Sequence, residues 1–246
     1  MIISWNGITS AGRVKPVNQD SVYFAVTPDK ECGIFVVADG VGGLDSGEVA
    51  SRTAVEETEK WWNVFSAEVR NVSTEATVDA LSNLVFEING KIQKINIEND
   101  KKSATTFSLL LIVGNRYFIA HVGDSRVYAL DKSNDGSLEL LQATRDHTKA
   151  GWREVNGRRF MQNMLTDGLG YKKSINCDCS FGVLNEETGG FLLCSDGVYK
   201  RQNETLIAGT ITANVFDPSR VCEELIYGAM RLGENDNITA ILVNVN

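Results

Sequence analysis

Histidine, paired cysteines and positive charge are all scarce in this chain of 246 residues. Two histidines are too few for a histidine-rich metal site, and the five cysteines include no Cys-x-x-Cys pair that would indicate a zinc site or a disulfide framework. The first residues contain no long apolar segment of the kind found in signal peptides, and no later run approaches the ~18 apolar residues of a membrane span. We therefore expect a cytoplasmic protein with reduced thiols.

Acidic residues outnumber basic ones by 32 to 24, which gives a formal net charge of -8. This balance argues against a nucleic-acid partner and against binding to an anionic membrane. An acidic protein that acts on a phosphorylated substrate needs a local positive charge, which a bound metal ion can supply. The length and the 43% hydrophobic content are those of an ordinary globular chain, so we expect a single domain over residues 1–246.

Hydrophobic patterning predicts an α+β fold. Short connections between consecutive predicted strands favour antiparallel pairing over the helical crossovers of a parallel sheet. Apolar residues repeat every three or four positions over about residues 78–95, which predicts a long helix, and two further helices are expected after the glycine-rich segment near residue 45 and over about residues 218–232. Two packed antiparallel sheets with helices outside would use all these faces. The predicted strands cover residues 21–26, 32–38, 105–113, 116–122, 126–131, 138–142, 191–195 and 238–245.

Acidic residues stand at the ends of these strands. The stretch VVADGVGG ends a buried strand on Asp39, and LLCSDGV repeats the pattern; the full set is Asp20, Asp39, Asp124, Asp196 and Asp236. If the sheets bring these ends together, the carboxylates repel one another by several kcal/mol unless a cation lies between them. Oxygen ligands without histidine predict Mg²⁺ or Mn²⁺. The glycine after each acid, Gly40 or Gly197, would let the backbone approach the ion, and its carbonyl could be a ligand.

Six motifs, VNQDSVYF, VVADGVGG, ATTFSLLLI, HVGDSRVY, LLCSDGV and NDNITAILV, occur in this order. They resemble the motif series of metal-dependent PP2C-type protein serine/threonine phosphatases, in particular the compact bacterial branch. The resemblance implies a four-layer αββα sandwich whose central cleft holds two Mn²⁺ or Mg²⁺ ions, with a third, looser ion between Asp124 and Asp196. It also implies that a hydroxide shared by two ions hydrolyses phosphoserine and phosphothreonine in proteins, without a phosphoenzyme.

The resemblance implies a role for individual residues of the site. Asp39 would bridge the first two ions, and the Gly40 carbonyl would bind one of them. Asp196 and Asp236 would complete the coordination of the other ion, while Asp20 would act on a metal-bound water. The implied metal residues are Asp20, Asp39, Gly40, Asp124, Asp196 and Asp236, of which Asp20, Asp39, Asp196 and Asp236 are also the expected catalytic residues.

Two positions depart from the family pattern. The family has an arginine before its N-[EQ]-D motif that grips the substrate phosphate, whereas GRVKPVNQD places Lys15 there, with Arg13 nearby. Lysine lacks the bidentate fork, so we expect weaker phosphate orientation and a higher KM, unless Arg13 takes the role. Val41 stands where eukaryotic members have a histidine thought to be the general acid, which leaves a metal-bound water or another group to protonate the leaving alkoxide. His147 is a less favoured candidate, and we expect His121 to be packed in its strand.

Residues from about 148 to 170 match the family's variable flap. Its arginines and aromatic residues could contact an acidic phosphopeptide, but we favour a solvated basic loop that covers its own apolar residues. The residues concerned are Trp152, Arg153, Arg158, Arg159 and Phe160. The adjacent Trp61 and Trp62 are expected in a helix core and not at a docking site.

The preferred function is a metal-dependent phosphatase for phosphoserine and phosphothreonine proteins. Lys15 motivates one alternative, a catalytically weak phosphoprotein-binding module. The remaining alternatives are a cation-binding structural domain and a phosphohydrolase acting on small phosphate esters at the same site. The expected partners are phosphorylated proteins and a cognate serine/threonine kinase, with no nucleic acid and no membrane, and we expect a monomer.

Overall fold

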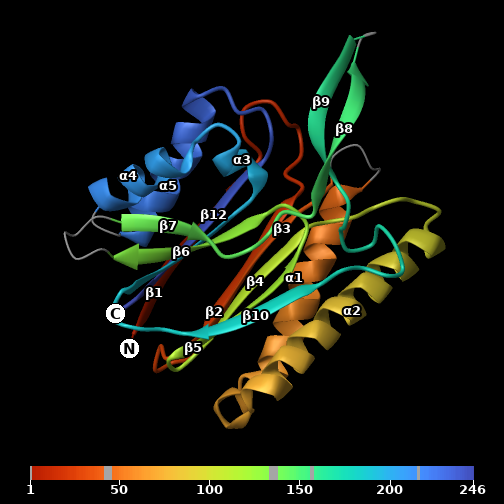
Figure 1. Cartoon of the computed structure of the whole chain (residues 1–246). Helices are drawn as coiled ribbons and strands as arrows, with labels where there is room; N and C mark the ends of the chain where they lie inside the picture. Colours follow the sequence, from red (N-terminus) through yellow and green to blue (C-terminus); the bar gives the residue numbers. More distant parts are fainter. Residues whose placement is uncertain (1, 42–45, 133–137, 156–157, 215–216) are drawn as a thin grey trace.

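The computed structural model describes residues 2–41, 46–132, 138–155, 158–214 and 217–246. Two antiparallel five-stranded sheets stack face to face, and helices cover both outer surfaces, so the layers run helix, sheet, sheet, helix (Figure 1). This architecture confirms the predicted α+β class and the four-layer sandwich. None of the helices in the described ranges is long and apolar enough to cross a membrane.

The first sheet has the order β1-β12-β11-β6-β7 and the second the order β10-β5-β4-β3-β2. The first consists of β1 (Ile3–Ser10), β12 (Ile238–Val245), β11 (Thr188–Cys194), β6 (Arg126–Lys132) and β7 (Leu138–Gln142). The second consists of β10 (Asp178–Val183), β5 (Arg116–Val122), β4 (Phe107–Val113), β3 (Cys32–Asp39) and β2 (Asp20–Val26). All eight predicted strands are present, to within three residues at their starts and one at their ends.

Helices α1 (Gly47–Phe65) and α2 (Thr74–Glu98), joined through the short 3-10 turn η1 (Val69–Asn71), cover the second sheet. On the other side lie α3 (Asp196–Tyr199), α4 (Glu204–Ala213) and α5 (Pro218–Arg231). Strands β8 (Thr148–Val155) and β9 (Arg158–Leu165) form a separate hairpin. Sequence patterning did not predict β1, β8, β9, β10, α3 or α4.

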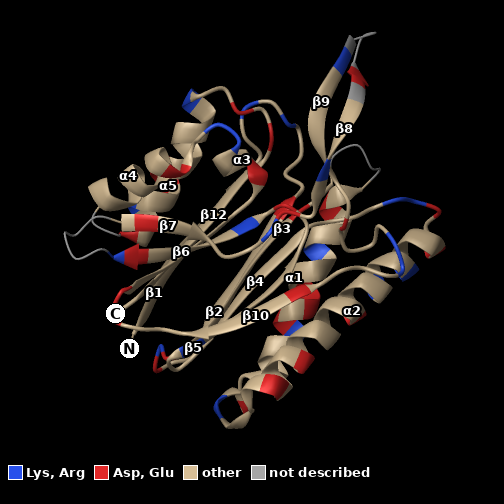
Figure 2. Ribbon diagram, in the orientation of Figure 1, with Lys and Arg blue, Asp and Glu red and all other residues tan. Residues whose placement is uncertain are grey.

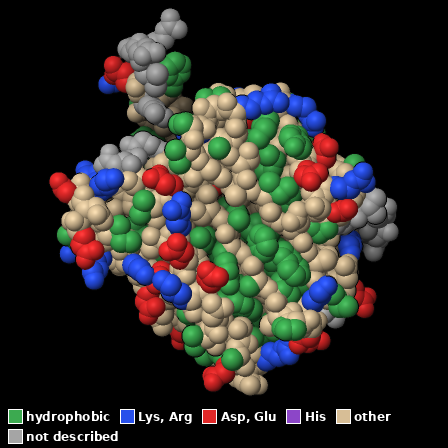
Figure 3. All heavy atoms as spheres, turned by 180° about the vertical axis from the view of Figure 1, so that it is seen from behind, with side chains coloured by type: hydrophobic (Ala, Val, Ile, Leu, Met, Phe, Trp, Pro, Cys, Tyr) green, Lys and Arg blue, Asp and Glu red, His purple; other side chains and the backbone are tan. Residues whose placement is uncertain are grey.

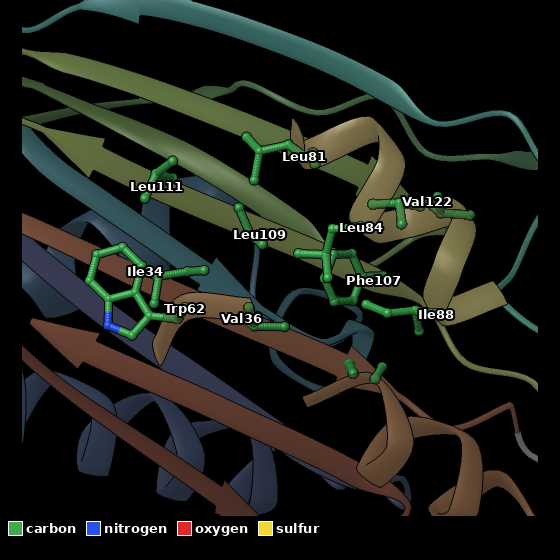
Figure 4. Packing of buried hydrophobic residues seen from close by; sticks show 14 of the residues in the cluster. Ile34, Val36, Trp62, Leu81, Leu84, Ile88, Phe107, Leu109, Leu111 and Val122 are labelled. Atoms are coloured by element: carbon green, nitrogen blue, oxygen red, sulfur yellow. The ribbon is translucent and has the colours of Figure 1, made fainter. Parts of the chain in front are cut away.

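The long helix α2 places one apolar stripe on the second sheet, as its periodicity predicts. Leu81, Leu84 and Ile88 point toward β4 and β5, and Trp62 of α1 lies beside Ile34 in the same cluster (Figure 4). Trp61 is partly buried and stacks on Phe65, with ring centroids 4.2 Å apart. The tryptophan pair therefore belongs to the helix–sheet core, as expected, and does not form an exposed surface.

Candidate active site

The β2–β3 hairpin brings two of the predicted acids face to face. Asp20 is the first residue of β2, Asp39 is the last residue of β3, and the strand register pairs them directly. Paired residues of antiparallel strands project from the same face of the sheet, and like charges at such positions destabilise the pair. The local fold therefore concentrates negative charge at one end of the second sheet.

Three more acids reach the same place from other elements. Asp124 follows β5, Asp196 begins α3 directly after β11, and Asp236 lies two residues before β12. Figure 2 shows acidic residues gathered where β3 ends, near the base of the β8–β9 hairpin. A cleft of about 480 Å³ lies there, and five of the six predicted metal residues line it: Asp39, Gly40, Asp124, Asp196 and Asp236.

Asp20, the sixth predicted residue, lies behind the cleft. Its side chain is buried, and its Oδ2 accepts hydrogen bonds from Ser195 Oγ at 2.9 Å and Thr239 Oγ1 at 2.6 Å. Thr239 belongs to β12 of the other sheet, and Ser195 directly follows β11 of that sheet, so Asp20 links the two sheets across the sandwich. Within the described residues, its Oδ1 has no hydrogen-bond partner. Two ionised carboxylates cannot hydrogen-bond to each other, so a hydrogen bond between that atom and the facing Asp39 needs a proton on one of the two.

Burial and mutual repulsion raise the pKa values of these carboxyls. Burial is the main cause for Asp20, whose pKa rises to about 6, and for Asp124, whose pKa also rises to about 6. The pKa of Asp39 lies well above its usual range because of burial and the charges of Asp20 and Asp196. Burial raises the pKa of Asp196 as well, although Lys200 opposes this. Without a cation, the site can hold its acids together only by keeping protons on some of them.

The raised pKa of Asp124 predicts a pH-dependent cost in the metal-free protein. Its pKa is 3.8 in the unfolded chain and about 6 in the fold, so the cost is absent below about pH 4 and complete above about pH 6. In EDTA, Asp124→Asn should therefore match the parent's free energy of unfolding near pH 4 and exceed it by roughly 3 kcal/mol at pH 7. Urea unfolding at several pH values measures this difference. A difference that does not grow with pH contradicts the account.

The acids lie around the cleft and do not converge on a single position. Across the described ranges, no group of three histidine, cysteine, aspartate or glutamate side chains forms a ready-made ion cage. Two of the acids contact lysines instead: Lys15 Nζ lies 3.0 Å from Asp236 Oδ1, and Lys200 Nζ contacts Asp196 Oδ2. Such a ring suits a hard cation that keeps several of its own waters, as Mg²⁺ does.

The loop before β2 positions Lys15 in the cleft and leaves Arg13 outside it. Lys15 lines the cleft, whereas Arg13 is exposed and is not among the lining residues. Asn237 holds the loop, because its Nδ2 donates to the carbonyls of Ala11 and Val17, both at 3.1 Å. Of the two cations that the sequence leaves open for phosphate binding, the geometry favours Lys15.

The two glycines that follow strand-end acids are also needed for the packing of the backbone. A Cβ on Gly40 would lie 2.6 Å from the backbone oxygens of Gln19 and Gly47, and a Cβ on Gly197 would lie 2.1 Å from the carbonyl oxygen of Asn237. These glycines therefore allow backbone segments to pack against each other, and their role in the approach to an ion stays a prediction. The other glycines of that loop, Gly42 and Gly43, lie outside the described residues.

Neither histidine lines the acidic cleft. His147 lines a separate hollow of about 780 Å³, where its Nε2 lies 3.1 Å from Asp178 Oδ2. His121 is buried, as expected, with Nδ1 2.9 Å from Ser108 Oγ, and burial together with His147 lowers its pKa to about 4. Val41 lines the cleft itself, so a nonpolar side chain stands at that position.

The β8–β9 hairpin projects from the body of the molecule (Figures 1 and 3). Residues 162–165 of β9 line the acidic cleft, so the base of the hairpin forms one wall of it. Trp152 and Phe160 are 63% and 53% exposed, which contradicts the favoured expectation that this segment covers its own apolar residues. Arg159 lies 3.9 Å from Glu154, while the side chains of Arg153 and Arg158 are outside the description.

Sequence reasoning missed the residues that hold the acids in place. Thr106 Oγ1 accepts a hydrogen bond from the Asp39 backbone at 2.9 Å, and Thr105 Oγ1 donates to the Asp39 carbonyl at 2.9 Å. These threonines precede β4 and stand beside the end of β3. Polar residues at the start of a buried strand were the only available signal, since their partner is more than 60 residues away in the chain.

A model of the protein phosphatase 2C family matches residues 9–224 of this chain. The chain belongs to the protein phosphatase 2C family. It is thus a hydrolase of the protein phosphatase class, and metal dependence is a property of this family. Protein phosphatase PhpP of Streptococcus pneumoniae is 30% identical over 97% of this chain and 96% of its own length.

Two solved structures of this family share the fold. The serine/threonine phosphatase Stp1 from Staphylococcus aureus superposes with a TM-score of 0.84 at 21% identity, covering 100% of this chain and 96% of its own. The catalytic domain of the serine/threonine protein phosphatase PstP, solved in complex with two manganese ions, has a TM-score of 0.75 at 24% identity and covers 99% and 98% of the two chains. The sandwich expected from the motif series is therefore that of solved protein phosphatases.

Proposed function

We propose that this protein hydrolyses phosphoserine and phosphothreonine in proteins, with the acidic cleft as the active site and Mn²⁺ or Mg²⁺ as the cofactor. The observation that carries the proposal is the direct pairing of Asp20 with Asp39, two carboxyls whose pKa values desolvation raises. Divalent ions fit this site because they relieve the repulsion and bind oxygen ligands. When bound, they supply an activated water and neutralise the charge that develops on the phosphoryl oxygens.

We assign the ions to four residues of the cleft: Asp39, the Gly40 carbonyl, Asp196 and Asp236. Thr105 and Thr106 fix the Asp39 backbone, so this carboxylate is held in place before an ion arrives. We assign proton acceptance from the attacking water to Oδ1 of Asp20. The Ser195 and Thr239 hydroxyls engage the other oxygen, Oδ2, and thereby leave Oδ1 available.

Lys15 is assigned to the substrate phosphate. Its ammonium lies in the cleft beside Asp236, where it can attract a phosphate dianion as a point charge. We expect Lys15→Met to raise KM for a phosphopeptide by roughly tenfold or more, with a smaller change in kcat, because one charge-assisted contact is lost. Steady-state kinetics measure this.

Arg13→Met is the matched control, since it removes an exposed cation from the same loop, and its KM should stay within about twofold of the parent value. Lys15→Arg should keep KM at or below the parent value, because guanidinium binds phosphate bidentately. A larger effect from Arg13→Met than from Lys15→Met would transfer the assignment to Arg13.

We further assign residues 1–246 to a single catalytic domain and the segment at about residues 148–170 to its flap. The contribution of β9 to the cleft wall supports contact between this flap and the peptide on either side of the phosphoresidue. We place the protein in the cytoplasm as a monomer that opposes a serine/threonine kinase. The net charge of -8 disfavours nucleic acid as a partner.

Phosphate release in Mn²⁺ from a phosphothreonine peptide, a phosphoserine peptide and an aryl phosphate tests the function. We expect turnover of both peptides with a higher kcat/KM than for the aryl phosphate. Hydrolysis of the aryl phosphate alone would instead indicate a small-ester phosphohydrolase. Peptide binding without any turnover would indicate a phosphoprotein-binding module.

A further inference from the structure

Lys200 is a cation within the acidic cleft that the assigned roles leave unused. It follows α3, lines the cleft together with Asp124 and Asp196, and places its Nζ against Asp196 Oδ2. The Asp196 side chain is only 12% exposed and that of Lys200 is 49% exposed, so the pair spans the cleft wall from its interior to its rim. Lys200 also acts electrostatically on Asp124, whose charge in turn favours the lysine's protonated form.

The segment that carries Lys200 is fastened to the turn that carries Asp124. The Tyr199 hydroxyl donates a hydrogen bond to the Asp124 carbonyl at 2.7 Å, and the Lys200 backbone donates to the Asp196 carbonyl at 2.9 Å. The Arg126 guanidinium lies 3.7 Å from the centre of the Tyr199 ring and is itself held by both carboxylate oxygens of Asp146, at 3.0 and 2.8 Å. The ammonium is thereby kept close to the two acids expected to hold a third, looser ion.

We propose that the ammonium of Lys200 takes the place of that third ion, so that the cleft binds two divalent cations and no more. This inference rests on the proposed metal-dependent function. The five acids, Asp20 included, carry five negative charges at most, and Lys15, Lys200 and two divalent ions already bring six positive charges. A third ion would share the Asp196 carboxylate with the Lys200 ammonium. Two cations that contact the same carboxylate repel each other strongly in a partly buried site.

The number of Mn²⁺ ions bound at saturation tests this directly. Equilibrium dialysis against rising Mn²⁺, followed by metal analysis, should give two ions for the parent and a third, weaker one for Lys200→Met. Lys172→Met is the matched control, because Lys172 forms a similar ion pair outside the cleft lining. Its Nζ lies 2.9 Å from Asp167 Oδ1, and the side chains of Lys172 and Asp167 are 44% and 5% exposed. It should leave the count at two.

A parent that binds three ions, or a folded Lys200→Met protein that still binds two, overturns the inference while leaving the proposed function intact. A parent that binds none overturns both. If Lys200→Met fails to fold, Asp124→Asn decides the question in the otherwise unaltered chain. Its count should stay at two, because Lys200 already takes the place of the ion that Asp124 would help to hold, and a loss of one ion relative to the parent overturns the inference.

Discussion

Asp39→Asn is expected to lower kcat by roughly a thousandfold or more, since the carboxylate proposed to hold the ions contributes several kcal/mol of transition-state stabilisation. Asp39 stands at the end of β3, faces Asp20 and lines the cleft, and a neutral amide there would not supply the charge that the proposed ions require. Steady-state hydrolysis of a phosphothreonine peptide in saturating Mn²⁺ measures the loss.

The same variant should be more stable than the parent in EDTA. The pKa of Asp39 is raised by burial and by its acidic neighbours, so removing its charge relieves repulsion in the metal-free fold. If Asp39→Asn has lower activity but higher stability without metal, the loss of activity comes from a missing metal ligand and not from a folding defect. Asp29→Asn is the control: it removes an exposed acid from the turn of the same hairpin, and kcat should not change. Full activity of Asp39→Asn would contradict the assignment.

Removal of divalent ions should reduce phosphopeptide hydrolysis to background, a loss of at least about a thousandfold, because the ions supply the activated water and neutralise the charge that develops on the phosphoryl oxygens. Adding Mn²⁺ back should restore the rate and raise the melting temperature by roughly 5–10 °C at a hundredfold excess over Kd, since the ions bind the folded ring of acids and not the unfolded chain.

The shift in melting temperature has its own control in Asp39→Asn, which should show a much smaller rise with Mn²⁺. Activity that persists in EDTA after exhaustive dialysis would contradict metal dependence for this chain. A melting temperature unchanged by Mn²⁺ in the parent would remove the argument that ions relieve the repulsion between Asp20 and Asp39.

The strand-end acids could be predicted from sequence because each belongs to a local pattern. A buried apolar run that stops at an aspartate followed by glycine, as at Asp39 and Asp196, is visible without any tertiary information. The partners of Asp20 were not predictable in this way. Ser195 and Thr239 lie 175 and 219 residues away in the chain, and only the packing of the two sheets brings them within hydrogen-bond distance.

Lys200 was missed because a lysine four residues after an aspartate usually forms an ordinary surface pair. Here the pair lies in the cleft instead, because the short helix α3 begins at the cleft with Asp196 and ends one residue before Lys200. Strand β1 was missed for a related reason: its sequence, ISWNGITS, has weak alternation, and its pairing with β12 makes it a strand. The exposure of Trp152 and Phe160 likewise depends on the projection of the β8–β9 hairpin, which composition does not reveal.

Anomalous diffraction at the manganese edge, from crystals of the parent protein grown in Mn²⁺, tests the central claim most directly. The account predicts two anomalous peaks in the acidic cleft, with Asp39 between them, the Gly40 carbonyl at one, and Asp196 with Asp236 at the other. Crystals that hold manganese elsewhere, or that show no peak within reach of Asp39, would contradict it.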